Sequence, residues 1–517
     1  MPKSSRELEV KLTLSDEQLR RARVVGLPGD FTSAPTQVRT LHAIYFDSPD
    51  LRLRSRGLSL RLRKSDAAWM QTVKAETGVI GGLSTPIECE VPVDGPQPSI
   101  GAIPDKELRK ALRRAIGKSS LQSVFETEVE RTTKQLTSAA GDHIEVALDA
   151  GIVRTTQRSE PIRELELELK AGDPATLVRI ASTLIDAGPI HVSRWSKAER
   201  GYRLSTDQAA PEPAPDPGVK TRIEPEQTCI AAFEACCRAA TAQVLHNWPV
   251  VLDSDDSEGP HQMRVGIRRL RTALRMFRPV IDSEALRVLD RKLKLLARSA
   301  GEVRDTDVLA HEIVGPLVRF ADGEPGLRQL REMLSGVATR RRVELRSLLA
   351  GRDQTLLQIE LAVLAESIAR QHGKSAQKRL SRPVDSFAPN FLEESWRKLS
   401  KHGADLDGLA IEERHDMRKD LKRLRYRIHF LAPLFSAAQV RPYLKATSHM
   451  QDLFGSLNDI ALAHSLRRIA LVEGASGPDL SRAIGFAIGW HECQAELAWR
   501  DAKASWSALR RRRRFWK

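Results

Sequence analysis

The 517-residue sequence has few cysteines, few aromatic residues and no long apolar run. Its five cysteines are odd in number and show no CxxC spacing, which argues against a disulfide framework or a thiolate zinc site and favours a reducing compartment. No apolar run approaches the roughly 18 residues that a membrane helix needs. The first residues, MPKSSRELEVKL, are charged before an apolar signal region could form. We therefore expect a cytoplasmic protein without a membrane segment.

Aromatic residues make up 5% of the chain, whereas Lys and Arg number 82 against 67 acidic residues, a net charge of +15. Such a basic excess favours polyanionic partners: nucleic acid, polyphosphate or an anionic membrane surface. Single-stranded nucleic acid is usually held by stacking on aromatic side chains, and the basic stripes described below lack interleaved aromatics. This absence argues against nucleic acid as the partner.

The chain is longer than one hydrophobic core supports, since domains usually hold roughly 50 to 200 residues. The stretch AAPEPAPDPG carries four alternate prolines, which block helix and sheet and predict an extended linker. Segments before it alternate apolar and polar residues as strands do, and segments after it show helical spacing. We expect a multidomain α+β chain with a mostly β domain at 1–205, a linker at 206–221, a helical domain at 222–510 and a basic tail at 511–517. The tail is expected to be a disordered, anion-touching end or a frayed, solvated helix end.

Charged residues recur on one face of successive strand-like segments in the first domain. In ELEVKL, Glu7, Glu9 and Lys11 alternate with aliphatic residues, and the same period of two occurs in SLRLRK, IECEV, IEVALD and ELELELK. One charged strand is often merely solvated, but the repetition favours a closed barrel, whose interior must be filled by side chains or ligand. Carboxylates suit a hard cation such as Mg²⁺ or Mn²⁺, and Arg and Lys suit phosphate oxygens.

Five ordered blocks in this domain resemble the CYTH family, the triphosphate tunnel metalloenzymes: the ExExK signature from Glu7 to Lys11 and the segments 45–64, 69–74, 164–170 and 196–204. The resemblance implies an antiparallel, eight-stranded β tunnel that binds triphosphate-containing substrates with a divalent metal and, in many members, hydrolyses them. It implies metal positions at Glu7, Glu9, Glu166 and Glu168, with Glu90, Glu145 and Asp149 as further acidic positions. It also implies phosphate-binding positions at Lys11, Arg61, Arg63, Lys74, Arg131, Lys197 and Arg200, with a catalytic role for Glu7, Glu9 and Lys11.

The helical domain contains an internal duplication. HQMRVGIRRLR at 261–271 aligns without a gap with HDMRKDLKRLR at 415–425, an offset of 154 residues, and GEVRDTDVL aligns with GSLNDIALA at the same offset. Each helix carries a basic stripe with helical spacing: His261, Arg264, Arg268, Arg271 and Arg275 in one, and His415, Arg418, Lys422, Arg425 and His429 in the other. Few acidic residues in the same helices can neutralise these stripes, which therefore indicate polyanion binding. The histidines fit equally well a buried, neutral role that ties helices together.

The duplicated HxxR pattern, followed by an RD or ND pair, resembles the CHAD family over about residues 222–510. This resemblance implies an all-α domain of two duplicated four-helix bundles with a basic groove between them, and binding of inorganic polyphosphate. CYTH followed by CHAD is a known pairing. Together the two resemblances predict a divalent-metal-dependent triphosphatase, in the cytoplasm or on polyphosphate granules, whose helical domain binds polyphosphate. The alternative is a non-catalytic protein that binds polyphosphate or is targeted to granules.

Overall fold

The computed structural model describes residues 8–517, apart from residues 26–27, 66–67, 76–78, 81–82, 85–86, 186–189, 207–211, 222, 322, 369–377, 379, 405, 407 and 410. The chain forms two compact units. One comprises Met1–Pro213 with Leu348–Arg370, and the other comprises Ala214–Ser347 with Gln371–Lys517. The first unit therefore includes a segment that lies far beyond the proline-rich stretch in the sequence.

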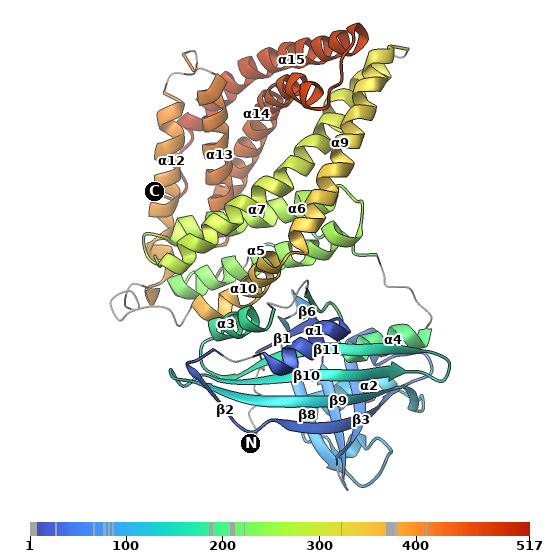
Figure 1. The fold of residues 1–517 in the computed structure, drawn as a ribbon. Helices are drawn as coiled ribbons and strands as arrows, with labels where there is room; N and C mark the ends of the chain where they lie inside the picture. The colour runs from blue at the N-terminus through green and yellow to red at the C-terminus, as the bar shows by residue number, and fades with distance from the viewer. Residues whose placement is uncertain are drawn as a thin grey trace. The chain divides into compact units, whose positions relative to one another are not determined.

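The first unit is built around one antiparallel sheet (Figure 1). Its long strands follow the order β1-β11-β10-β9-β3-β4-β5-β8. They are β1 (Leu8–Thr13), β3 (Gln37–Asp47), β4 (Leu58–Ser65), β5 (Ala68–Ala75), β8 (Ile87–Val93), β9 (Gln122–Ser138), β10 (His143–Arg154) and β11 (Ser159–Ala171). Segments of two or three residues complete it: β2 (Phe31–Ser33), β6 (Val79–Ile80), β7 (Leu83–Ser84) and β12 (His191–Val192). The sheet is antiparallel, as the resemblance implies, but it has twelve strands among the described residues rather than eight.

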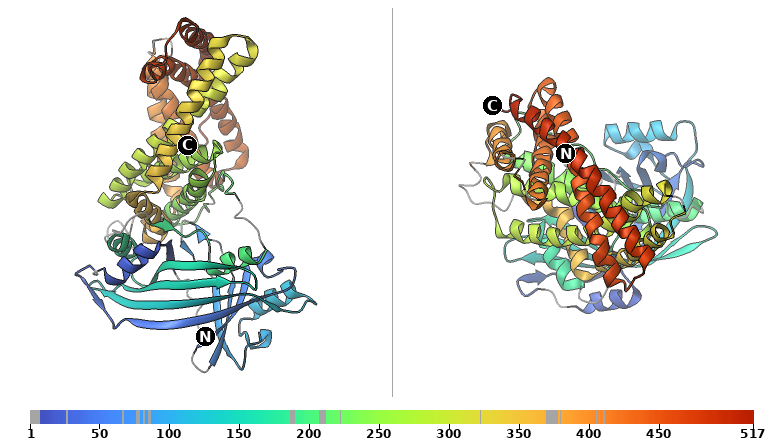
Figure 2. Two further views of the ribbon diagram at one scale, coloured as in Figure 1. Left: turned by 45° about the vertical axis from the view of Figure 1, so that its right-hand side comes forward. Right: turned by 90° about the horizontal axis from the view of Figure 1, so that it is seen from above.

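The sheet bends back on itself, so that one of its faces encloses an interior. Its light-blue strands cross behind its teal strands in Figures 1 and 2. In a flat sheet, six steps between strands would separate β1 from β5 by about 29 Å. Yet the charge of Lys74 on β5 acts on Glu9 of β1. The strands thus form the expected tunnel.

Helices cover the outer face of the sheet with apolar side chains. α1 (Asp16–Val24), α3 (Ala175–Leu184) and α10 (Arg352–Ile368) share a core with β1, β10 and β11, and α2 (Lys106–Ile116) shares one with β4 and β5. On β11, Leu165 and Leu167 lie in the core shared with α1, α3 and α10, and Glu164 and Glu166 alternate with them on the other face of the strand. All four residues are buried. Burial of both faces is what a filled barrel requires, so the charged face is an interior rather than a wet surface.

An apolar cluster built on α4 (Lys197–Thr206) fills part of the interior beside the charged residues. Ala198 and Tyr202 of this helix pack there with Phe125 of β9. Gly201 permits the close approach, because a Cβ at this position would lie 2.1 Å from the Phe125 ring. The packing holds the first turn of α4, which carries Lys197, against the sheet.

The second unit is helical and repeats. The first repeat has α5 (Cys229–Asp253), α6 (Glu258–Phe277), α7 (Glu284–Val308) and α9 (Pro325–Leu349), with η4 (Leu309–Val314) and α8 (Gly315–Phe320) after α7. The second repeat has α12 (Ala388–His402), α13 (Ile411–Leu431), α14 (Ala437–Val472) and α15 (Pro478–Arg511). Shifting α6 by the predicted offset gives 412–431, the span of α13 within one residue. Over the residues described, no helix has the length and apolar character needed to cross a membrane.

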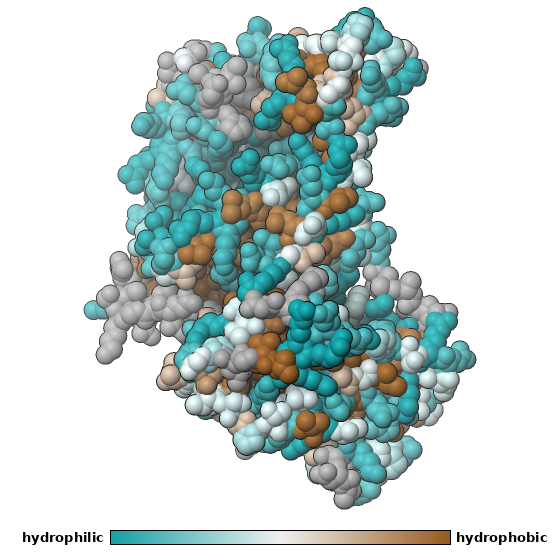
Figure 3. All heavy atoms as spheres, in the orientation of Figure 1, coloured by the Kyte–Doolittle hydropathy of each residue, from teal (hydrophilic) through white to brown (hydrophobic). Residues whose placement is uncertain are grey.

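The two repeats share a hydrophobic core. Leu317 of α8 and Leu327 of α9 lie in one apolar cluster with Leu466 of α14 and Ile484 of α15. The helices of the expected bundles therefore interlock at this core. The basic helices α6 and α13 also contact each other. On the face of the molecule seen in Figure 3, hydrophilic side chains predominate, with apolar patches between them.

The basic tail agrees in part with one of the two expectations for it. α15 continues to Arg511, and Trp516 beyond it is 3% exposed, packed against the rings of Trp396 and Tyr443. Its indole Nε1 donates to Glu393 Oε2 at 3.0 Å. The arginines at 510–513 are exposed, as a solvated helix end requires, whereas Trp516 beyond them anchors the tail in an aromatic cluster.

Candidate functional site

Strands that are distant in the sequence bring the charged residues together on the inner face. β1 pairs with β11 so that Lys11 lies opposite Glu166, although 155 residues separate them. β11 pairs with β10 so that Glu164 lies opposite Asp149. β9 then places Arg131 opposite Asp149. Because side chains alternate between the two faces of each strand, these residues point to the same interior.

Asp149, Glu164 and Glu166, here called the acidic centre, are the carboxylates at the middle of this interior. All three are buried, and one oxygen from each lies within 4.8 Å of the others. Lys197 Nζ contacts the three at 2.8 Å, 2.6 Å and 2.7 Å respectively, and Arg200 Nη1 donates to Glu164 at 2.9 Å. The carboxylates already converge on one cation, and oxygen donors of this kind are those that Mg²⁺ and Mn²⁺ prefer. The donor set therefore fits a hard divalent ion.

Two more cations border the acidic centre from neighbouring strands. Arg131 donates to both carboxylate oxygens of Asp149, at 2.7 Å and 2.6 Å, and also to Glu166. Lys11 contacts Glu166 at 3.0 Å and Glu9 at 3.1 Å. Glu9 and Lys11 of the ExExK signature are thus at the edge of the acidic centre, whereas Glu7 lies outside the described residues.

These contacts shift the pKa values of the buried groups. Burial alone would raise the pKa of Glu166, but Arg131, Lys11 and Lys197 hold it well below its usual value. Burial would likewise lower the pKa of Lys197, but the carboxylates of the acidic centre raise it well above its usual value. The pKa of Glu9, in contrast, is raised, chiefly by burial. Glu166 and Lys197 therefore stay charged at neutral pH, each stabilised by the other.

A second charged cluster belongs to β4, β5 and β8. Lys74 contacts Glu88 at 2.6 Å, Arg61 contacts Glu88 at 3.4 Å, and Arg63 contacts Glu90 at 3.3 Å. Three cations share two carboxylates here, so the cluster has a net positive charge that suits phosphate oxygens. Its Lys74 also acts on Glu9 of the first cluster. The two clusters therefore face one interior.

The acidic centre does not include three residues that the resemblance gives as metal or further acidic positions: Glu90, which belongs to the second cluster, Glu145 and Glu168. Glu145 and Glu168 are opposite each other on β10 and β11, but Glu145 accepts a hydrogen bond from Gln135 and Glu168 pairs with Lys170 at 2.5 Å. Glu164, which the sequence reasoning did not assign to the metal, is one of the three carboxylates that converge. The alternation of ELELELK does contain its signal, because Glu164 shares a face with Glu166.

In the helical unit, the basic stripes of α6 and α13 act on each other. Burial lowers the pKa of Lys422 to about 7, and Arg418, Arg268, Arg264 and Arg425 add to this shift. Burial also lowers the pKa of Arg418 to about 10, helped by Arg268. Cations from both repeats thus gather in one cluster, which resists a further positive charge and would be stabilised by an anion.

The two stripes differ in their acidic partners. Asp290 of α7 contacts Arg271 at 2.6 Å and Arg275 at 3.0 Å, which neutralises one end of the first stripe. The corresponding residue in the second repeat is Leu444, and Arg425 there bonds a neutral glutamine side chain at 2.7 Å. Asp290 comes from the next helix, so the spacing of acidic residues within α6 itself gives no sign of this partner.

The cationic cluster includes Arg268 from the first stripe and Lys422 from the second. Over the residues that the structure describes, neither makes an ion pair with a carboxylate. The nearby histidines fit the neutral role: burial, with Arg304 as the next cause, lowers the pKa of His261. Burial, with Arg425 as the next cause, lowers that of His429 to about 4. The side chain of His415 lies outside what the structure describes.

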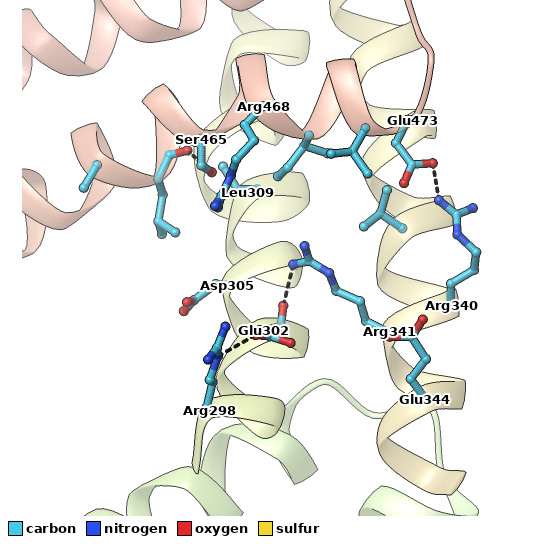
Figure 4. Close-up of a pocket in the computed structure, with 15 residues that line it drawn as sticks. Arg298, Glu302, Asp305, Leu309, Arg340, Arg341, Glu344, Ser465, Arg468 and Glu473 are labelled. Atoms are coloured by element: carbon cyan, nitrogen blue, oxygen red, sulfur yellow. Dashed lines mark hydrogen bonds and ion pairs between the residues drawn. The ribbon is translucent and has the colours of Figure 1, made fainter. Parts of the chain in front are cut away.

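A separate hollow of about 720 Å³ lies between α7, α9 and α14 (Figure 4). Four arginines line it together with four carboxylates: Arg298, Arg340, Arg341 and Arg468, with Glu302, Asp305, Glu344 and Glu473. Figure 4 shows Arg298 bound to Glu302, a contact of 3.2 Å, and Arg340 bound to Glu473. Because its charges balance, this hollow is not the polyanion site that the stripes predict.

Comparison with known families agrees with both parts of this description. Residues 5–202 match the model of the CYTH domain, and residues 235–468 match the model of the CHAD domain. The chain is a CYTH domain followed by a CHAD domain. The acidic centre lies in the CYTH domain, and the cationic cluster of α6 and α13 lies in the CHAD domain.

Similar proteins cover one or both domains. An inorganic triphosphatase of Haemophilus influenzae is 32% identical over 206 residues, which are 39% of this chain and 56% of that protein. The CYTH-CHAD chain thus spans little more than half the length of this relative. An uncharacterised protein of Mycobacterium tuberculosis is 27% identical over 505 residues, 92% of this chain and 90% of that protein. The crystal structure of a CHAD domain from the plant Ricinus communis has 25% identity and a TM-score of 0.50, over 58% of this chain and 98% of that chain.

Proposed function

We propose that the CYTH domain hydrolyses inorganic triphosphate, or a related short polyphosphate, with Mg²⁺ or Mn²⁺, and that the CHAD domain binds long-chain inorganic polyphosphate. The proposal of hydrolysis rests on the acidic centre, which is buried among Lys11, Arg131 and Lys197. The similarity to a protein named inorganic triphosphatase supports the same activity.

The chemistry of phosphoryl transfer to water suits this interior. The reaction depends on positioning and charge neutralisation more than on a covalent nucleophile. Arg61, Arg63 and Lys74 on one side and Lys11 and Arg131 on the other would bind phosphate oxygens. These cations would hold the substrate between the two clusters and share the negative charge that develops as the phosphate bond breaks.

The carboxylates of the acidic centre make the reaction depend on a metal. Asp149, Glu164 and Glu166 would hold the ion, beside Glu9. A bound divalent ion supplies a Lewis acid and positive charge next to the phosphate oxygens. Without it, the carboxylates keep Lys11, Arg131 and Lys197 as their counter-charges, so these cations are less available to the phosphate oxygens of the substrate.

Removal of the metal tests the proposal directly. Purified full-length protein is expected to release phosphate from tripolyphosphate with Mg²⁺, to lose this activity in excess EDTA, and to regain it when Mg²⁺ is restored. Parallel assays with pyrophosphate and ATP would define the substrate. Undiminished turnover in EDTA would contradict the metal-dependent mechanism, and binding of tripolyphosphate without release of phosphate would favour the non-catalytic alternative.

The second part of the proposal rests on the cationic cluster of α6 and α13. A chain of phosphates carries repeated negative charges without bases, so it can contact Arg264, Arg268, Arg418 and Lys422 in succession. The arginine of each HxxR pattern is also held in place: in the first repeat Arg264 contacts Asp305 at 2.9 Å. In the second, Asp459 at the corresponding position acts on Arg418.

Polyphosphate binding is expected to weaken about tenfold between pH 6 and pH 8 because of Lys422. Its pKa is lowered to about 7 by burial and by the surrounding arginines of α6 and α13, so the free protein holds Lys422 charged at pH 6 and mostly neutral at pH 8. A bound polyanion favours the charged form, so binding at pH 8 must take up a proton. Titration calorimetry in buffers of different ionisation enthalpy would measure this uptake. The Lys422→Arg variant should bind with little pH dependence, and an unchanged pH profile in that variant would contradict the assignment.

A further inference from the structure

Helix α10 departs from the duplication of the CHAD domain. In the second repeat, α15 runs without a break from Pro478 to Arg511, which corresponds to 324–357 in the first repeat. In the first repeat, α9 ends at Leu349, the chain turns at Gly351, and α10 begins as a new helix. The duplicated architecture therefore does not account for α10.

The packing of α10 places it in the tunnel unit. Leu348–Arg370 groups with Met1–Pro213, although the match to the CHAD model spans this segment. Ile359 and Val363 of α10 are buried in the hydrophobic core that covers the outer faces of β1, β10 and β11. A helix from within the CHAD sequence thus completes the apolar cover of the strand that carries Glu9 and Lys11.

One buried hydroxyl joins α10 to the segment before β12. Thr355 is 3% exposed, and its Oγ1 donates to the backbone oxygen of Ile190 at 2.9 Å; the Gly351 oxygen in its own chain segment lies at 3.3 Å. α10 also contacts α3 and β12. The bond to Ile190 is therefore the polar part of a broader contact between α10 and this edge of the tunnel.

β12 continues the connection from Ile190 to the site. Its two residues, His191–Val192, pair with Leu12 and Thr13 of β1. The next amide, that of Ser193, donates to the backbone oxygen of Lys11 at 2.8 Å. The chain then enters α4, whose first residue contacts all three carboxylates of the acidic centre. A short run of backbone thus links Thr355 to two cations of the candidate active site.

We infer that Thr355 is a positioning residue for the tunnel: it fixes Ile190 and β12 against β1, and thereby sets the positions of Lys11 and Lys197 at the acidic centre. The kinetic consequence rests on the proposed triphosphatase activity, whereas the structural consequence does not. Amide hydrogen exchange tests the structural consequence, and kcat and KM test the kinetic one. The two measurements together separate a failure of this inference from a failure of the proposed function.

The test compares three variants of the full-length protein. Thr355→Val removes the hydroxyl and keeps the branched shape, and Thr355→Ser restores a donor. Thr447→Val is the matched control: Thr447 is also a buried helical threonine, but among the described residues its hydroxyl bonds only the oxygens of Tyr443 and Leu444 in its own helix. Amide hydrogen exchange at Ser193 and Leu12, together with kcat and KM for tripolyphosphate with Mg²⁺, would be measured for each.

In Thr355→Val, exchange at Ser193 should be about tenfold faster, because local opening of β12 becomes easier. The kcat should fall about 3- to 10-fold through misplacement of the cations. Thr355→Ser and Thr447→Val should both resemble the parent protein. Unchanged exchange at Ser193 in Thr355→Val, or an equal increase in Thr447→Val, would overturn the inference. If the parent protein releases no phosphate, the proposed function fails, and the exchange comparison still decides the role of Thr355.

Discussion

Replacing Glu166 with Gln is expected to lower kcat/KM for tripolyphosphate at least about 100-fold, the upper end of the loss seen when even an outer partner of a metal ligand is removed. Glu166 belongs to the acidic centre and contacts Lys11, Arg131 and Lys197. Gln keeps the size of the side chain but removes the charge that would hold a divalent ion. Steady-state phosphate release with Mg²⁺ would measure the loss, and Glu164→Gln should reproduce it.

A matched control separates this effect from a general change of charge. Glu130 lies next to Arg131 on β9 but points to the opposite face, where it is half exposed and contacts Arg23 at 2.8 Å. Glu130→Gln alters the net charge by the same amount and should keep nearly full activity, because exposed ion pairs contribute little. Circular dichroism and thermal melting would check that all variants fold. A folded Glu166→Gln protein with parental activity would remove the acidic centre from the mechanism.

The inner face of the tunnel could be predicted from the sequence because strand alternation is local information. The period of two in ELEVKL, SLRLRK and ELELELK predicts that Glu9, Arg61 and Glu166 each lie on the charged face of their own strand. Which strands become neighbours is not local. The pairing of β1 with β11, which joins Lys11 to Glu166, closes the chain over 155 residues. For the same reason, the sequence could not distinguish Glu164, which converges with Asp149, from Glu168, which does not.

In the helical domain, too, some features could be predicted from the sequence and others could not. Its duplication is confirmed, since the offset read from HQMRVGIRRLR carries α6 onto α13. What the offset cannot predict is where the two repeats differ. Asp290 and Leu444 occupy corresponding positions, yet only Asp290 neutralises arginines of the neighbouring helix. The break at Gly351 that releases α10 to the tunnel unit is likewise invisible to a pattern that assumes equal repeats.

Because Asp290 neutralises Arg271 and Arg275, the cations without a carboxylate partner are expected to contribute most to polyphosphate binding. Arg268→Gln combined with Lys422→Gln is expected to weaken binding of long-chain polyphosphate at least about 100-fold, since each lost hydrogen bond to a charged group contributes about 1.5 to 3 kcal/mol. These two cations come from the two stripes of the cluster, and among the described residues neither forms an ion pair with a carboxylate. The slope of log K against log salt should also become less steep by about 1.4, if polyphosphate behaves as single-stranded nucleic acid does.

The matched control is Arg271→Gln combined with Arg275→Gln, which removes the same formal charge from the same face. Both arginines are already bound to Asp290, so the control should weaken polyphosphate binding far less. Both double variants should hydrolyse tripolyphosphate at the parental rate, because the acidic centre lies in the other unit.

Competition with DNA and RNA at equal phosphate concentration completes the experiment. A flexible chain of phosphates can follow cations at helical spacing, whereas duplex DNA needs a surface that fits its width. Equal losses in the two double variants would mean that the face acts only through its overall charge. Equal competition by nucleic acid would replace polyphosphate with a general polyanion as the ligand of this domain.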